Sequence, residues 1–203
     1  MRFWLAAAIG AGASYCLPAW FGWTGLGVIA WKGAGVSLLA IWAASRARGA
    51  DGWLIALVMA LGASGDVLLN AVGETSGAVA FLAGHLVAIA LYLRNRRPSL
   101  APSQRLLGLV IAPLTVVTAV TCVAAAGKAL PVGIYAAVLG SMAAMAWTSR
   151  FPRYRTGLGA ILFVASDLLI FSRMGPLAGS HLPTLLVWPL YFAGQALIAI
   201  GVV

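Results

Sequence analysis

Two of the chain's four acidic residues lie inside long apolar runs, Asp66 in LGASGDVLLN and Asp167 in LFVASDLLIF. An Asp at the centre of a membrane helix costs roughly 2.5 to 3.5 kcal/mol on insertion scales, so such residues normally face a bundle interior or a wet cavity. Burial disfavours the charged form of a carboxyl group, and a nearby cation such as Lys32 favours it. Two buried aspartates can therefore supply an acid and a base, which suits acid-catalysed hydrolysis.

Other polar side chains fall at similar depths in the apolar runs. At the helical rise of 1.5 Å per residue, Asp66 and Asp167 lie roughly 6 Å and 3 Å outward of the middle of their runs. We expect six side chains to share a slab roughly 10 Å thick and to face one polar cavity: Asp66, Asp167, Lys32, His85, Tyr191 and Gln195.

Besides the two aspartates, Lys32 and His85 are candidates whose side chains can carry a charge, and each has more than one possible role. Lys32 could neutralise an aspartate as a structural ion pair, or it could bind an anionic headgroup, and both readings keep it inside the bundle. His85 is a lone imidazole, which is more often a hydrogen-bonded packing residue than a base. The sequence leaves these alternatives open.

The neutral candidates also have structural readings. Tyr191 and Gln195 stand one helical turn apart, where they could simply form interhelical hydrogen bonds. Asn70 lies with Glu74 toward the outer end of its apolar run, where a solvated or capping role is common. We include Asn70 and Ser166, the residue before the second aspartate, as candidate substrate contacts.

Composition defines the elements that must position these residues. The chain is 63% hydrophobic and 8% charged, with a mean hydropathy of +1.01, whereas an average soluble domain has roughly 25% charged residues. Because lipid offers backbone groups no partner, an integral membrane protein of this kind is expected to be helical. The sequence predicts one all-α transmembrane domain, 1–203, with eight spans at 3–19, 24–44, 53–72, 77–93, 106–126, 130–149, 156–173 and 183–202.

Arginine residues give the orientation of this bundle. Alternate loops carry nearly all of them, and the opposite loops hold only Lys128 and Arg173. With Arg2 at the start, the positive-inside rule predicts that both termini are cytoplasmic. The net charge of +9 then matches anionic lipid, and we expect no nucleic-acid partner. The first apolar run is interpreted as an uncleaved helix, because removing it would break the charge alternation.

Short motifs exclude several kinds of site. Cys16 and Cys122 fall in predicted spans without CxxC or His-rich spacing, which favours buried structural thiols over a disulfide or a metal site. The chain has no GxSxG, HExxH or P-loop motif, so we expect no metal and no cofactor. The segments 63–69 and 165–169 are similar, which is compatible with a 4+4 parallel repeat and equally with chance.

The order and spacing of four segments resemble the YhhN-like lysoplasmalogenase family over essentially the whole chain. These segments are GD-x-L-L around Asp66, Gly84-His85, Phe163-x-x-Ser166-Asp167 and Tyr191-Phe192-x-x-Gln195. Family members often have an aromatic or His-Tyr-like pairing after the histidine, whereas Leu86-Val87-Ala88 follow it here. This departure puts the role of His85 in doubt.

The resemblance implies hydrolysis of the vinyl ether bond of lysoplasmalogens, which releases a fatty aldehyde and a glycerophosphoethanolamine or glycerophosphocholine. Protonation of the vinyl β-carbon gives an oxocarbenium ion that water captures. One of Asp66 and Asp167 would be the general acid, and the other would be the water-activating base and cation stabiliser. Lys32 or Arg173 could hold the phosphate of this lysophospholipid substrate, and no protein partner is implied.

Two other classes of function remain open from the sequence. In a proton-coupled or cation transporter, the intramembrane Asp and His residues would carry ions across the bilayer. In a lipid-binding scaffold, they would only hold the fold together. The bias toward Ala, Gly and Arg suggests a GC-rich bacterial genome, so we expect a multi-pass protein of the bacterial inner membrane.

Overall fold

The computed structural model describes residues 2–203 and contains no β-strand within them. Its elements in chain order are α1 (Arg2–Ser14), α2 (Cys16–Phe21), α3 (Leu26–Arg46), α4 (Gly49–Ala71), α5 (Glu74–Arg94), α6 (Pro102–Val123), η1 (Ala124–Ala126), α7 (Ala129–Thr148), η2 (Arg153–Gly157), α8 (Leu158–Ser172) and α9 (Leu182–Val202). Within residues 2–203, eight helical segments are long and apolar enough to cross a membrane. The predicted all-α, eight-span fold is therefore confirmed, and the chain is a multi-pass membrane protein.

Two spans begin four residues earlier than the sequence predicted, at Gly49 and Pro102 instead of 53 and 106. Asp51 lies in the first turn of α4, where a negative charge is favourable next to the free N–H groups of a helix. At the start of α6, the Gln104 side chain accepts a 3.0 Å hydrogen bond from the backbone N–H of Ala101. Charged and polar residues at these points belong to helix starts and not to loops.

The first span is divided into α1 and α2, a break that the apolar run does not reveal. Pro18 is the third residue of α2. Proline weakens a helix because it has no N–H to donate and its ring crowds the carbonyl four residues before it, here that of Ser14. The helix α1 ends at that residue. Both cysteines are free thiols; Cys122 is buried, whereas Cys16 is half-buried and not fully buried as the sequence predicted.

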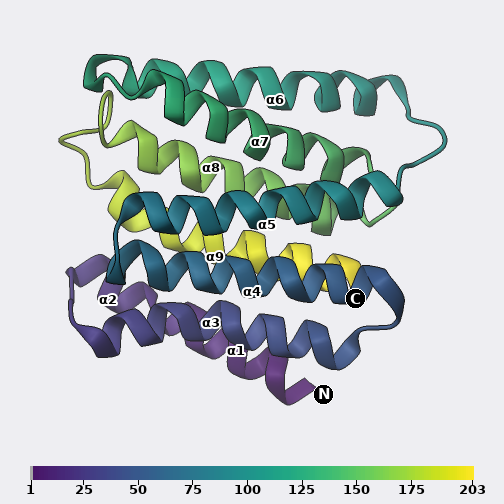
Figure 1. Ribbon diagram of the computed structural model, residues 1–203, viewed down its shortest axis with the longest axis horizontal. Helices are drawn as coiled ribbons and strands as arrows, with labels where there is room; N and C mark the ends of the chain where they lie inside the picture. The colour runs from purple at the N-terminus through teal and green to yellow at the C-terminus, as the bar shows by residue number, and fades with distance from the viewer. Residues whose placement is uncertain (1) are drawn as a thin grey trace.

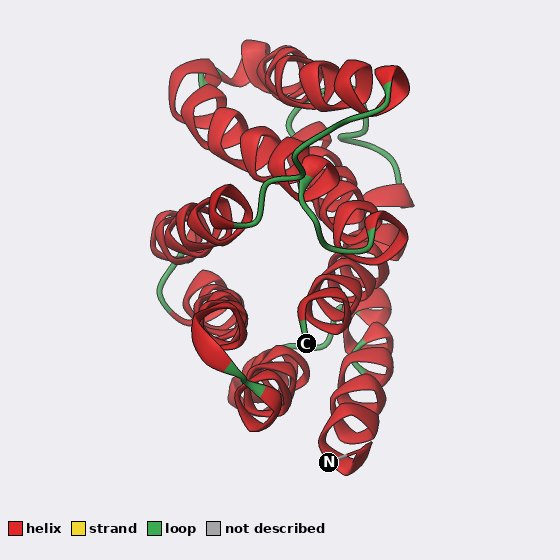
Figure 2. Ribbon diagram, turned by 90° about the vertical axis from the view of Figure 1, so that its right-hand side faces the viewer, coloured by secondary structure: helices red, strands yellow, loops and turns green. Residues whose placement is uncertain are grey.

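All helices lie roughly side by side in one bundle, with the connecting loops at its two ends (Figure 1). Figure 2 looks at the bundle from the end where both termini lie. The arginine-bearing connections after α3, α5 and α7 are at this same end, so the charge asymmetry of the sequence corresponds to two different ends of the molecule. The cytoplasmic location of this end and the 4+4 repeat stay predictions.

Small residues bring the helices that carry the site close together. A Cβ added to Gly159 of α8 would lie 2.7 Å from the backbone oxygen of Gly194 in α9, and one added to Gly194 would lie 2.7 Å from the oxygen of Gly159. A Cβ on Gly65 of α4 would lie 2.8 Å from the Phe81 ring of α5. Close backbone approach at small residues is the common way in which membrane helices pack. It places α4, α5, α8 and α9 around a shared centre.

Candidate functional site

Asp66 lies on α4 inside the bundle and has partners from two other helices. The Tyr191 hydroxyl of α9 donates a 2.7 Å hydrogen bond to Asp66 Oδ2. On the other side, Lys32 Nζ of α3 lies 4.0 Å from Asp66 Oδ1 and donates a 2.9 Å hydrogen bond to Asn70 Oδ1. Gln195 Nε2 donates a 3.3 Å hydrogen bond to the Tyr191 oxygen. We call these five residues the Asp66 network.

Asp167 lies on α8 and has a separate set of partners. The Tyr135 hydroxyl of α7 donates a 2.8 Å hydrogen bond to Asp167 Oδ2. His85 Nε2 of α5 lies 3.3 Å from the same hydroxyl oxygen. These three residues form the Asp167 network. Asp167 and His85 are both buried, so the network connects two polar groups that are held away from solvent.

In both networks a tyrosine hydroxyl donates its hydrogen bond to an aspartate and accepts one from a third side chain. A tyrosine hydroxyl has a single proton, and both Tyr191 and Tyr135 give it to a carboxyl oxygen. Each hydroxyl oxygen can then only accept its second hydrogen bond. The Gln195 amide supplies that bond to Tyr191. By the same reasoning the proton of His85 is on Nε2, and a neutral imidazole is left with an unprotonated Nδ1.

Aromatic rings bring the two networks together. Phe163 packs edge-on against His85 with 5.0 Å between ring centroids, and against Tyr191 with 5.1 Å. Phe81 lies beside it, at 6.1 Å from Phe163 and 5.8 Å from Tyr191. A single phenyl ring therefore contacts one member of each network.

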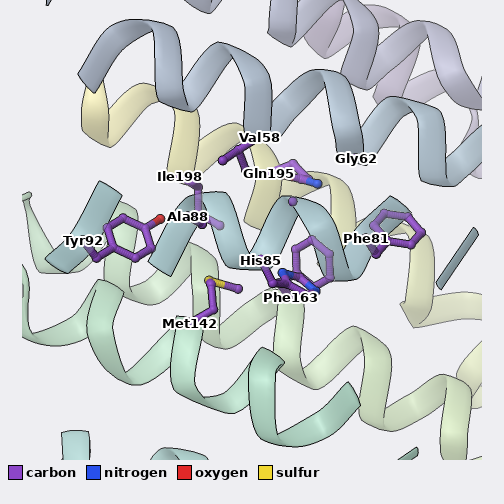
Figure 3. Close-up of a pocket in the computed structure, with 11 residues that line it drawn as sticks. Val58, Gly62, Phe81, His85, Ala88, Tyr92, Met142, Phe163, Gln195 and Ile198 are labelled. Carbon is purple, nitrogen blue, oxygen red and sulfur yellow. The ribbon is translucent and has the colours of Figure 1, made fainter. Parts of the chain in front are cut away.

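A cavity of about 10 Å³ is lined by one residue of each network, His85 and Gln195 (Figure 3). His85 and Gln195 supply polar groups to its wall, and Phe81 and Phe163 are also part of it. The remaining lining residues are mostly apolar: Val58, Gly62, Gly84, Ala88, Tyr92, Met142 and Ile198. Neither aspartate is among the lining residues. Each is instead connected to one of them through its tyrosine, by way of Gln195 or His85.

The remaining candidates from the sequence have other contacts. The Ser166 hydroxyl donates a 3.0 Å hydrogen bond to the Val187 backbone oxygen and thereby ties α8 to α9. Glu74 lies in the first turn of α5 and is paired with Lys128 at 3.6 Å. Among residues 2–203, no three His, Cys, Asp or Glu side chains lie close enough together to hold a metal ion.

Tyr135 is the member of the site that the sequence analysis did not identify. It stands in an apolar run of α7, where an aromatic residue reads as packing. One feature of the sequence could have pointed to Tyr135: the aromatic residue that often follows the histidine in the family is absent after His85, so an aromatic partner could come from elsewhere in the chain. The structure supplies that partner from another helix, with ring centroids of His85 and Tyr135 5.7 Å apart.

The whole sequence was compared with known families, curated proteins and solved structures. The sequence model of the YhhN family matches residues 27–202. Proteins named lysoplasmalogenase from Mycobacterium bovis and Mycobacterium tuberculosis are each 31% identical to the chain over 167 residues, which cover 73% of this chain and 59% of each relative. The aligned region thus spans less than two thirds of the length of these relatives. No solved structure matches the chain.

Proposed function

The chain belongs to the YhhN family, and on that premise we propose that it hydrolyses the vinyl ether bond of lysoplasmalogens inside the membrane. The products are a fatty aldehyde and a glycerophospho-alcohol. The observation that carries this proposal is the pair of buried carboxyls, Asp66 and Asp167, each held by a tyrosine hydroxyl at the centre of the bundle. The name of the mycobacterial relatives supports the same chemistry.

Unequal surroundings suggest different roles for the two aspartates. Asp66 has the Lys32 ammonium 4.0 Å away as a counter-ion, so it can remain ionised in the apolar interior. Among residues 2–203, no salt bridge reaches Asp167, and an isolated buried carboxylate is costly compared with the neutral acid. We therefore assign Asp167 as the general acid and Asp66 as the ionised partner.

The reaction follows from these roles. Asp167 donates its proton to the β-carbon of the vinyl ether, and the resulting oxocarbenium ion is stabilised by the negative charge of Asp66. Water adds to the cation and loses a proton to give a hemiacetal. The hemiacetal collapses to the aldehyde and the alcohol. Paired carboxylates divide the work in the same way in glycoside hydrolysis, which also passes through an oxocarbenium-like state.

The lipid headgroup belongs at the bundle end opposite the termini. Lys32 and Asn70 lie on the route from that end to Asp66, and Arg173 follows α8 at the same end. Arg173 there can bind the substrate phosphate while the alkenyl chain stays between helices. Since the named relatives are bacterial, we place the protein in a bacterial inner membrane.

The decisive assay uses purified protein and two lipids that differ in one double bond. A 1-alkenyl lysophospholipid should release fatty aldehyde, whereas the 1-alkyl analogue should stay intact because a saturated ether cannot accept a proton at carbon. The proposal fails if the alkenyl lipid is not cleaved. Proton movement across liposomes without cleavage would instead identify a transporter, and lipid binding with neither activity would identify a scaffold.

A further inference from the structure

Three polar side chains line the cavity between the networks, His85, Gln195 and Tyr92; the Tyr92 hydroxyl has no hydrogen-bond partner among residues 2–203, and the other two residues each leave one acceptor atom over. Gln195 uses Nε2 on Tyr191, which leaves its Oε1 as an acceptor. His85 uses Nε2 on Tyr135, which leaves Nδ1 as an acceptor. Both residues line the cavity. A ligand held between His85 and Gln195 can therefore donate one hydrogen bond to each of them.

The size of the cavity restricts this ligand to a very small molecule. Its volume is about 10 Å³, close to the roughly 10–15 Å³ that one water molecule requires. Water has two protons to donate, which matches the two acceptors. When both protons are engaged, the oxygen lone pairs are free to attack an electrophile.

Resting on the proposed function, we propose that this cavity is the site of the hydrolytic water and that His85 and Tyr135 return the proton of that water to Asp167. Asp167 loses a proton to the substrate β-carbon in the first step and must regain one before the next turnover. The chain of hydrogen bonds from the cavity through His85 and Tyr135 ends on the Asp167 carboxyl. The path from the cavity to Asp66 begins instead at the Gln195 amide, which does not readily accept a proton.

The protons balance along this route. The water oxygen forms a bond to the oxocarbenium carbon and releases one proton to His85 Nδ1. His85 passes its Nε2 proton to the Tyr135 oxygen, and Tyr135 passes its hydroxyl proton to Asp167 Oδ2. The ionised Asp167 becomes neutral again and the phenol is restored, while the neutral imidazole ends with its proton on Nδ1 and regains the Nε2–H form by proton exchange with water before the next turnover. Asp66 stays ionised throughout and needs only to stabilise the cation.

Tyr135→Phe tests the return path because it removes the hydroxyl that joins His85 to Asp167. The first turnover uses a proton that Asp167 already holds, and His85 can still accept one from water. Rapid mixing should therefore show a burst of one aldehyde per active protein at the wild-type rate, followed by steady turnover that is slower by about 10². Asp167→Asn should show neither phase. Tyr15→Phe is the matched control, since Tyr15 is a buried tyrosine that packs against Trp188 and should keep both phases.

The outcomes separate this inference from the proposed function. If the wild type releases no aldehyde, the function itself is wrong. If the wild type is active but Tyr135→Phe slows the burst and the steady phase equally, or slows neither, the return path is wrong. His85→Ala gives an independent test should Tyr135→Phe fail to fold. It should lose about 10² in turnover and recover part of it when imidazole is added, and wild-type turnover or the absence of any recovery would overturn the inference.

Discussion

Lys32 Nζ lies 4.0 Å from Asp66 Oδ1, whereas the carboxyl of Asp167 has a tyrosine hydroxyl as its partner. The same ammonium donates to Asn70 Oδ1 and is largely shielded, with 15% of the Lys32 side chain exposed. This geometry favours Lys32 as the counter-ion of Asp66 over Lys32 as a headgroup ligand. The two readings that the sequence left open now make different predictions.

Lys32→Met should slow the enzyme on every vinyl ether substrate, whether or not the substrate carries a phosphate. Loss of one buried electrostatic partner is expected to lower turnover on the order of 10². The measurement compares a 1-alkenyl lysophospholipid with 1-alkenylglycerol, which lacks the phosphate. Arg173→Gln is the contrasting variant and should raise KM only for the phospholipid. If Lys32→Met is impaired on the phospholipid alone, Lys32 binds the headgroup and the counter-ion role is wrong.

Gly62→Ala should weaken the Asp66 network without unfolding the protein. The added Cβ would lie 2.7 Å from Gln195 Nε2 and 3.6 Å from the Tyr191 oxygen. The Gln195 amide is the end of a flexible side chain, so it should move away and give up its hydrogen bond to Tyr191. We expect a thermal unfolding midpoint close to that of the wild type and a turnover reduced by about fivefold, since loss of a neutral hydrogen bond is worth about 1 kcal/mol.

The control for this substitution is Gly10→Ala on α1, where an added Cβ has nothing within 4 Å. It should leave both turnover and unfolding unchanged. Equal turnover of the Gly62→Ala variant and the wild type would show that the position of the Gln195 amide is unimportant to the reaction.

The eight spans could be predicted because lipid imposes length and apolarity on every crossing segment. The break after Ser14 could not, because hydropathy runs through it and only Pro18 marks it. The early starts at Gly49 and Pro102 were missed for the opposite reason, since polar residues near a helix start look like a loop.

Part of the candidate site could be predicted because an ionisable residue inside a membrane span is energetically costly and is therefore usually functional. Asp66 and Asp167 were identified from their positions inside long apolar runs, but the sequence gives the depth of a side chain in the membrane and not the direction in which it points around the helix. The Tyr135 hydroxyl therefore resembled ordinary packing until the structure placed it 2.8 Å from Asp167 Oδ2. The same limitation applied to Ser166, which points to a backbone oxygen and to neither network.

Reporter fusions test the orientation of the bundle. The C-terminus and the arginine-rich connection 95–101 should be cytoplasmic, and the connection 173–181 should be on the opposite side. An extracytoplasmic signal from the C-terminal fusion would invert the topology. The headgroup would then enter from the cytoplasmic side, and the arginine asymmetry would need another explanation.

The most direct test of the central claim is aldehyde release from a 1-alkenyl lysophospholipid by the purified wild type, Asp66→Asn and Asp167→Asn. Asparagine preserves side-chain volume while it removes the ionisable group, so the loss should appear in turnover more than in thermal unfolding. We expect each variant to fold and to be slower by about 10² or more, which is the scale of removing a general acid for Asp167 and of removing a stabilising charge for Asp66. Two folded variants that release aldehyde at near wild-type rates would contradict the two-carboxylate mechanism.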